Sequence, residues 1–227
     1  GQVMRASTFR LRPSGFTLIE LMVVLAVIAV LMFVAAPSFR GLMEVQRVKG
    51  VSDQFITDVQ FARSEAASRQ ETVGITFKPP GAAFTCYTVH TCGSRAPAAC
   101  SCNCTAAVGS RCPAAGVADP DPPREIRTVQ FPTADRVRFE PILNTGNPLP
   151  PAAPATTITF NPATGGLSAH YPTGVWILPV PPNGAFWGRT ASTVSGSTVV
   201  IRDLVNSSGR PSTCKPSTSS INGIAPC

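Results

Sequence analysis

The apolar and polar residues of the chain change their spacing twice, and each change predicts a different element. Residues 16–36 form an apolar run in which Glu20 is the only charged residue. At 1.5 Å per residue this run makes a helix of about 31 Å, long enough to cross the hydrocarbon core of a bilayer. We therefore expect a transmembrane helix at residues 16–36.

After Pro37 the apolar residues recur at steps of three and four, which predicts one apolar stripe on a helix that continues to about Gln70. The stripe consists of Phe39, Leu42, Val45, Val48, Val51, Phe55, Val59, Ala62 and Ala66. The charged residues, Asp58 among them, fall on the remaining faces of this helix, residues 37–70. Pro37 lies inside the predicted helix, and a proline removes a backbone hydrogen bond and clashes with the preceding turn. We expect either a kink or local break there, or merely the point where the chain leaves the membrane.

Beyond residue 70 the apolar residues alternate with polar ones, which predicts β-strands. The pattern recurs in the segments TVGITFK, AFTCYTV, DRVRFE, TTITF and STVVIRDLV. The fold class is therefore α+β, with a long N-terminal helix packed on an antiparallel sheet domain at residues 71–227. We expect Trp176, Phe186 and Trp187 in the core of that domain or at its edge rather than in a ligand cage.

Composition and charge agree with a membrane segment joined to a loop-rich domain. Only 14% of the 227 residues are charged, against roughly 25% in ordinary soluble domains. Three of the 19 basic residues, Arg5, Arg10 and Arg12, precede the apolar run, so a chain that begins at Phe16 carries 16 basic and 12 acidic residues, a net charge of +4. The arginines are expected on the cytoplasmic side by the positive-inside rule, and the remaining charge falls short of a nucleic-acid-binding composition.

The cysteines all follow the apolar run and are even in number, which favours disulfides in an oxidising compartment. They are Cys86, Cys92, Cys100, Cys102, Cys104, Cys112, Cys214 and Cys227. Zinc is the competing interpretation, but no C-x-x-C pair occurs and His90 and His170 lie outside any H-x₃₋₅-H spacing. We expect no metal, and the connectivity does not follow from the spacing. Residues 92–124, rich in Cys, Ala, Pro and Gly, are interpreted as a surface insertion stapled by disulfides.

Glu20 argues against two simpler explanations of the N-terminal segment. A secretory signal peptide would use Val34, Ala35 and Ala36 as its cleavage site, but the apolar run exceeds the usual 7–15 residues. A plain anchor would gain nothing from a carboxylate that costs roughly 2.5–3.5 kcal/mol to insert. Glu20 is therefore a candidate functional residue.

The segment SGFTLIELMVVLAVIAVL closely resembles the type III signal of type IV pilins and pseudopilins. This resemblance implies that a prepilin peptidase removes residues 1–15 by cutting after Gly15 and methylates the new amine of Phe16. It also implies that Glu20 attracts the Phe16 amine of a neighbouring subunit during assembly, and that Pro37 marks a place where the helix bends or melts in a filament.

Three further segments, QFARSEAASRQETVGITF, ITFNPATGGL and VNSSGRPSTC, resemble the GspH/FimT family of minor pilins and pseudopilins. The resemblance implies a type IV pilin-like fold and, as in members of the FimU kind, a disulfide between Cys214 and Cys227. It implies a minor pilin at or near a pilus tip that helps to initiate assembly, or alternatively a GspH-like pseudopilin of a type II secretion system. The implied partners are other minor and major pilins, the prepilin peptidase, the inner-membrane assembly platform and the membrane itself. The implied location is the inner membrane with a periplasmic C-terminal domain, then the pilus or cell surface.

A further alternative is a DNA-binding pilin of the FimT kind, in which a GRxR-like loop contacts DNA during uptake. The chain has Gly209 and Arg210 but lacks the second arginine of that loop. The candidate contacts are Arg189, Arg202, Arg210 and Lys215, with Asp203 as the one opposing charge nearby; a solvated turn is the simpler interpretation. Because no catalytic or nucleotide-binding motif occurs, we expect neither an enzyme nor a cofactor.

Overall fold

The computed structural model describes residues 15–78, 84–96, 99–114, 120–142, 155–170 and 185–227. It divides the chain into two compact units, Gly1–Leu42 and Met43–Cys227, which are described separately below. One helix, α1 (Leu18–Arg69), begins in the first unit and ends in the second. The second unit adds a 3₁₀ turn, η2 (Thr133–Asp135), and the strands β1 (Val73–Phe77), β2 (Phe84–Thr91), β3 (Glu125–Pro132), β4 (Val137–Pro141), β5 (Thr156–Phe160), β6 (Leu167–His170), β7 (Phe186–Ser192), β8 (Val200–Val205) and β9 (Pro211–Cys214).

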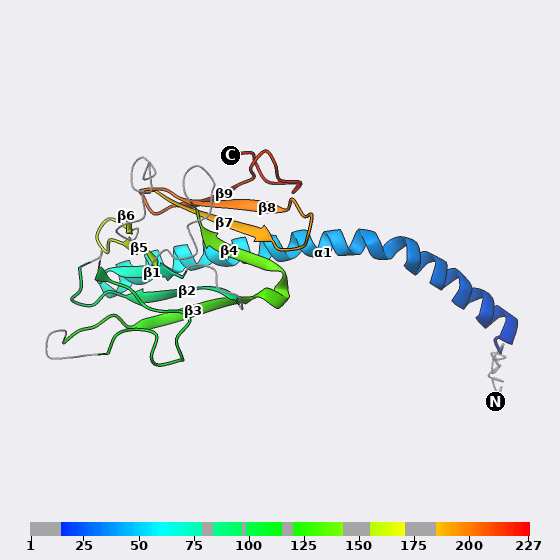
Figure 1. The fold of residues 1–227 in the computed structure, drawn as a ribbon, viewed down its shortest axis with the longest axis horizontal. Helices are drawn as coiled ribbons and strands as arrows, with labels where there is room; N and C mark the ends of the chain where they lie inside the picture. The colour runs from blue at the N-terminus through cyan, green and yellow to red at the C-terminus, as the bar shows by residue number, and fades with distance from the viewer. Residues whose placement is uncertain (1–14, 79–83, 97–98, 115–119, 143–154, 171–184) are drawn as a thin grey trace, which may run out of the picture. The chain divides into compact units, whose positions relative to one another are not determined.

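The strands form two antiparallel sheets that lie beside the C-terminal part of α1 (Figure 1). One sheet has the order β3-β2-β1-β5-β6 and the other the order β4-β7-β8-β9. The predicted α+β class is confirmed. The alternation of apolar and polar residues did not predict four of the described strands, β3, β6, β7 and β9. The residues of β9, PSTC, show no alternation of apolar and polar side chains, and they are extended because they pair with β8.

The apolar stripe of α1 is confirmed within the second unit. Val48, Phe55, Val59, Ala62 and Ala66 are all fully buried. Phe55 packs at the centre of an aromatic cluster, with ring centroids 4.6 Å from Phe139, 5.9 Å from Phe77, 6.0 Å from Tyr87 and 5.9 Å from Phe186. Phe186 therefore lies in the core as expected, Trp187 is half-buried, and Trp176 lies outside the described residues.

The five-stranded sheet has an apolar face and a polar face, and both are buried. Alternate residues such as Ile75 and Ile158 belong to the core cluster around Phe55. The opposite face carries Thr76, Thr88, His90, Thr157 and Thr159, all of them buried. Their polar groups are hydrogen-bonded: the Thr76 hydroxyl lies 2.7 Å from His90 Nε2 and 2.9 Å from the Thr157 hydroxyl, and the Thr88 hydroxyl lies 2.9 Å from that of Thr128.

The cysteine-rich insertion covers this polar face with its buried cysteines, and most of its other described residues are exposed or half-buried, as in a surface insertion. Cys100, Cys102 and Cys104 are buried, and the Cys102 N–H donates to the Thr76 hydroxyl at 3.4 Å. Three disulfides hold the segment: Cys86–Cys104, Cys92–Cys100 and Cys102–Cys112. Two of these bonds join neighbouring parts of the insertion, and Cys86–Cys104 ties it to β2.

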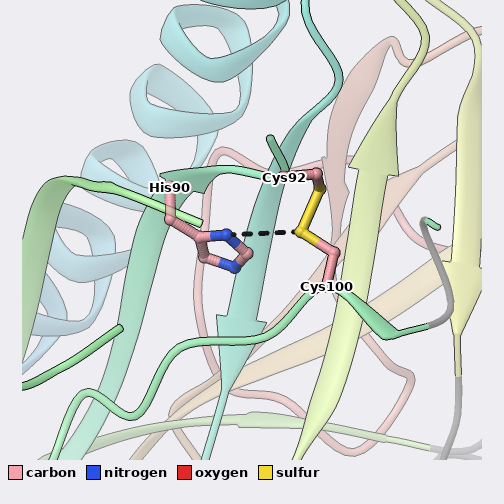
Figure 2. Close-up of side chains that lie close together, drawn as sticks. All are labelled: His90, Cys92 and Cys100. Atoms are coloured by element: carbon pink, nitrogen blue, oxygen red, sulfur yellow. Dashed lines mark hydrogen bonds between the residues drawn. A yellow bond between two sulfur atoms is a disulfide. The ribbon is translucent and has the colours of Figure 1, made fainter. Parts of the chain in front are cut away.

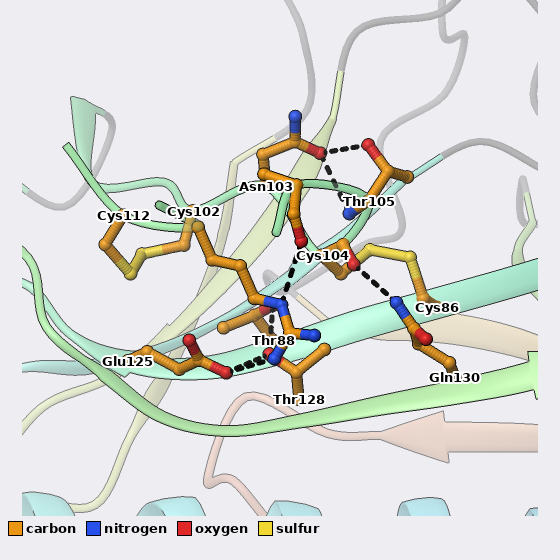
Figure 3. Close-up of polar contacts among 12 residues, drawn as sticks. Cys86, Thr88, Cys102, Asn103, Cys104, Thr105, Cys112, Glu125, Thr128 and Gln130 are labelled. Atoms are coloured by element: carbon orange, nitrogen blue, oxygen red, sulfur yellow. Dashed lines mark hydrogen bonds and ion pairs between the residues drawn. A yellow bond between two sulfur atoms is a disulfide. The ribbon is translucent and has the colours of Figure 1, made fainter. Parts of the chain in front are cut away.

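Polar contacts with β3 complete the attachment of the insertion (Figure 3). Arg111 Nη1 lies 2.5 Å from Glu125 Oε1, and the Gln130 amide donates to the Cys104 carbonyl at 2.9 Å. Burial raises the pKa of Glu125, but the hydrogen bonds from Thr128 and Arg111 and the charge of Arg111 outweigh it and leave that pKa lowered. The carboxylate therefore stays charged and keeps its bond to Arg111 over a wide pH range.

Candidate functional site

The N-terminal segment of the first unit has a sharp boundary between non-helical chain and helix. Gly15, Phe16 and Thr17 precede α1 and are exposed, and the helix begins at Leu18. The Thr17 hydroxyl accepts a hydrogen bond from the Glu20 backbone N–H at 3.3 Å, as an N-cap residue does. The junction between Gly15 and Phe16 thus lies two residues before the helix.

Glu20 occupies the first turn of α1, where a carboxylate is favoured. The unpaired N–H groups at a helix N-terminus carry a partial positive charge that stabilises an anion by about 0.3–1 kcal/mol. That gain offsets only part of the cost of placing Glu20 among apolar side chains. A positive partner would offset the rest.

The apolar run has no cover within its own unit. The window Leu18–Ala35 has a mean hydropathy of 3.0, none of it is buried, and it is long and apolar enough to cross a membrane. Phe16 is 81% exposed. Side chains of this kind on every face of a helix require lipid or other helices around them, and the apolar helix fits membrane anchoring.

Pro37 lies within α1, which the structure assigns as one element from Leu18 to Arg69. The local break considered above does not interrupt that element. A kink at Pro37 stays a prediction.

In the second unit a buried acid joins α1 to the four-stranded sheet. Asp203 of β8 is fully buried and accepts hydrogen bonds from the hydroxyls of Ser52 on α1 and Thr190 on β7. Burial raises the pKa of Asp203 from 3.8 to about 7, the two hydroxyl donors work against that rise, and the nearby charge of Asp53 adds to it. Asp203 thus points into the core and does not oppose the arginines of β7 and β8, contrary to the sequence-based expectation.

A second buried acid joins α1 to the five-stranded sheet. Asp58 was expected on an outer face of the helix, but it is fully buried. Its Oδ2 accepts from the Tyr87 hydroxyl at 2.7 Å, and its Oδ1 lies 3.0 Å from Arg127 Nη1. Burial, followed by the charge of Asp58 and the hydrogen bond to it, raises the pKa of the Tyr87 hydroxyl well above 10, so Tyr87 stays a donor.

The four candidate DNA contacts do not form one free basic surface. Arg189 of β7 forms an ion pair with Glu140 of β4. The Lys215 ammonium donates to the Ile221 carbonyl at 3.1 Å, inside the loop that the Cys214–Cys227 disulfide closes. Of these four candidates, only Arg202 and Arg210 have side chains without a hydrogen-bond or ion-pair partner among the described residues. Arg189 and Arg202 are cross-strand partners, so a second arginine lies beside the neutralised one.

The three segments that carry the family resemblance meet at one place in the second unit. Gly209, after β8, approaches Gly165, before β6, so closely that a Cβ on Gly209 would lie 2.3 Å from the Gly165 carbonyl oxygen. Arg63 of α1 packs on Gly165 from the other segment, and a Cβ on Gly165 would lie 2.6 Å from Arg63 Nε. The Leu167 N–H donates to the Ser207 carbonyl at 2.9 Å. The three segments that carry the family resemblance therefore form a junction between α1 and both sheets.

One cluster has metal-ligand chemistry in its composition. A nitrogen of His90 and the sulfurs of Cys92 and Cys100 lie within 4.8 Å of one another (Figure 2). The two sulfurs are joined in a disulfide and therefore offer no thiolate. Burial lowers the pKa of His90 to about 4, although the hydrogen bond to the Thr91 carbonyl raises it. His90 is thus a neutral, hydrogen-bonded core residue.

Family models match both the N-terminal segment and the larger C-terminal part of the chain. The prokaryotic N-terminal methylation motif matches residues 10–36. The family described as type II transport protein GspH matches residues 51–178. No curated protein and no solved structure matches the chain.

Proposed function

The chain belongs to the GspH family of minor pilins and pseudopilins, and on that premise we propose that it is a minor type IV pilin. It is a structural subunit at or near the pilus tip, where it helps to initiate assembly. The GspH and pilin-type families consist of structural, non-enzymatic subunits. A prepilin peptidase removes residues 1–15 and methylates the amine of Phe16.

One observation carries this proposal. The helix window Leu18–Ala35 exposes apolar side chains along its whole length and holds a single charge, Glu20, in its first turn. Before assembly, lipid of the inner membrane surrounds this segment and the C-terminal domain lies in the periplasm. After assembly, the corresponding helices of neighbouring pilins replace the lipid, and the positively charged, methylated amine of a Phe16 neutralises the Glu20 of an adjacent subunit. Breaking a buried pair of this kind costs about 3–5 kcal/mol, which makes the pair a strong selector of register.

The disulfide-held insertion supports a place on the outside of the cell. Three disulfides on the polar face of one sheet suit a domain that reaches an oxidising, exposed environment. The alternative is a GspH-like pseudopilin in a short periplasmic pseudopilus, which shares the same anchor and assembly chemistry. DNA uptake has less support, because two of its four candidate contacts are engaged within the domain.

The proposal is tested by following the Glu20→Gln variant from membrane to filament. We expect normal removal of residues 1–15 and more than a tenfold loss of the protein from sheared filaments, because the buried amine of the neighbour loses its partner. Glu65→Gln is the matched control, since Glu65 lies on α1 in the second unit and pairs with Arg69 at the surface. Incorporation of Glu20→Gln at the level of Glu65→Gln would contradict the proposed packing.

Deleting the gene separates the two systems. A loss of surface filaments with normal protein secretion supports the pilus, and the reverse supports the secretion pseudopilus. Gold-labelled antibody to the C-terminal domain tests the position, because a tip subunit labels filament ends and a minor subunit elsewhere labels the shaft.

A further inference from the structure

The start of α1 depends on one competition between two hydrogen-bond acceptors. In an α-helix each N–H bonds to the carbonyl four residues earlier, so a helix that extended upstream would pair the Glu20 N–H with the Phe16 carbonyl. In the structure the Glu20 N–H instead donates to the Thr17 hydroxyl at 3.3 Å. The next N–H along the chain, that of Leu21, donates to the Thr17 carbonyl at 3.2 Å. Both hydrogen bonds are accepted by Thr17, which is therefore the N-cap residue at which α1 begins.

The residues before Thr17 show the consequence of this cap. Gly15 and Phe16 are exposed and non-helical. A peptidase must bring its nucleophile and its oxyanion donors to the carbonyl of the bond that it cuts. In the first turn of a helix, the Gly15 carbonyl would be occupied by the N–H of Ile19. Outside the helix it is accessible.

We propose that Thr17 is a positioning residue for the cleavage of the Gly15–Phe16 bond. Its hydroxyl caps α1 and so keeps that bond outside the helix and open to hydrolysis, in which water adds across the C–N bond to leave the Gly15 carboxylate and the Phe16 amine. This inference rests on the proposed cleavage at Gly15 and adds to it the residue that presents the bond. Thr17 does not itself touch the reacting atoms.

The sequence also indicates where the helix would start without this cap. Ser14 is the next upstream residue with a side chain of the N-cap class, and Pro13 stands before it. A helix capped by Ser14 would include Gly15 and Phe16 in its first turn. Because unsatisfied N–H groups are costly next to lipid, a chain that loses the Thr17 hydroxyl gains by moving its helix start to Ser14.

The test measures the cleavage rate of full-length precursor in membranes with a prepilin peptidase, by mass spectrometry of the new Phe16 terminus. Thr17→Val keeps the shape of the side chain and removes the acceptor, and we expect it to be cut about five-fold more slowly. That factor converts to about 1 kcal/mol, within the usual range for the loss of an N-cap. Thr17→Ser keeps the acceptor and is expected within two-fold of the wild-type rate.

A double variant distinguishes capping from direct recognition by the peptidase. In a Ser14→Ala background the alternative cap is gone, so the effect of Thr17→Val, measured against Ser14→Ala alone, is expected to shrink below two-fold. An undiminished five-fold effect there would show that the peptidase reads the Thr17 hydroxyl, and would overturn the inference. Cleavage of Thr17→Val at the wild-type rate would overturn it as well. If the wild-type precursor itself is not cut, the proposed processing fails and the inference fails with it.

Discussion

Replacing Asp203 by asparagine should stabilise the protein at neutral pH and change its response to acid. The carboxyl group lies between α1 and two strands of the second sheet, with no exposed surface. An asparagine is close to its shape, accepts from Ser52 through its oxygen and donates through its nitrogen to the hydroxyl of Thr190. The substitution therefore removes the ionisable group and keeps both contacts.

The size of the effect follows from the pKa of Asp203, which burial raises from 3.8 to about 7. An acid whose pKa is raised in the folded state contributes its full stability below pH 3.8, and this contribution is lost as the pH rises to 7. Each pH unit in this window is worth about 1.4 kcal/mol for one proton. Wild-type protein should therefore lose about 4 kcal/mol relative to Asp203→Asn between pH 4 and pH 7.

His90 changes the free energy of unfolding with pH in the opposite direction, and so it masks the pH dependence due to Asp203 in the wild-type protein. Its pKa is lowered from 6.5 to about 4, chiefly by burial. A base whose pKa is lowered in the folded state contributes its full stability above pH 6.5. This contribution is lost as the pH falls to 4, again at about 1.4 kcal/mol per pH unit. Between these limits the two groups cancel, so wild-type stability should change little while Asp203→Asn becomes steadily more stable as the pH rises.

Urea unfolding of the full chain in detergent, with disulfides intact and Trp fluorescence as the signal, measures these differences. Asp135→Asn is the matched control, because Asp135 is an exposed carboxylate in η2 and is not among the groups that shift the pKa of Asp203. It should change the free energy of unfolding by no more than about 0.5 kcal/mol at any pH. If wild type and Asp203→Asn differ equally at pH 4.5 and pH 7.5, Asp203 does not titrate in this window and the reasoning is refuted.

Two substitutions test other contacts of the same domain by the same unfolding assay. Gly209→Ala should cost about 3 kcal/mol, since φ is 75° and a Cβ would lie 2.3 Å from the Gly165 carbonyl. Gly196→Ala is its control: φ is 77° with no atom within 4 Å, so only about 1 kcal/mol of backbone strain is expected, and equal costs would contradict the close approach. Tyr87→Phe should cost about 1–3 kcal/mol, because buried Asp58 loses a donor, and an unchanged stability would show that the bond contributes nothing.

The extent of the helix and the class of the fold followed from the sequence because both depend on local periodicity. The apolar stripe from Val48 to Ala66 is buried where its spacing placed it. The alternating segments around Ile75 and Ile158 became paired strands. The apolar run before Pro37 was equally plain, since its length and its single charge are properties of consecutive residues.

Whether a charged side chain is buried or exposed depends on partners that lie far along the chain. Asp58 and Glu65 occupy the same helix and look alike in sequence, yet one is buried and the other forms a surface ion pair. Asp58 is buried because Tyr87 and Arg127, from two strands, supply its hydrogen bond and counter-charge. No periodicity of the helix contains that information.

The sequence by itself determined a long apolar helix and an α+β domain, because neighbouring residues decide each of these. Only the tertiary structure decided how the six cysteines other than Cys214 and Cys227 pair, what the insertion covers, and whether Arg189 and Lys215 stay free. It placed Cys86 beside Cys104 and Arg189 beside Glu140, although 18 and 49 residues separate them in the chain. Such contacts are set by the packing of whole sheets, and the energy of each depends on burial that local sequence does not encode.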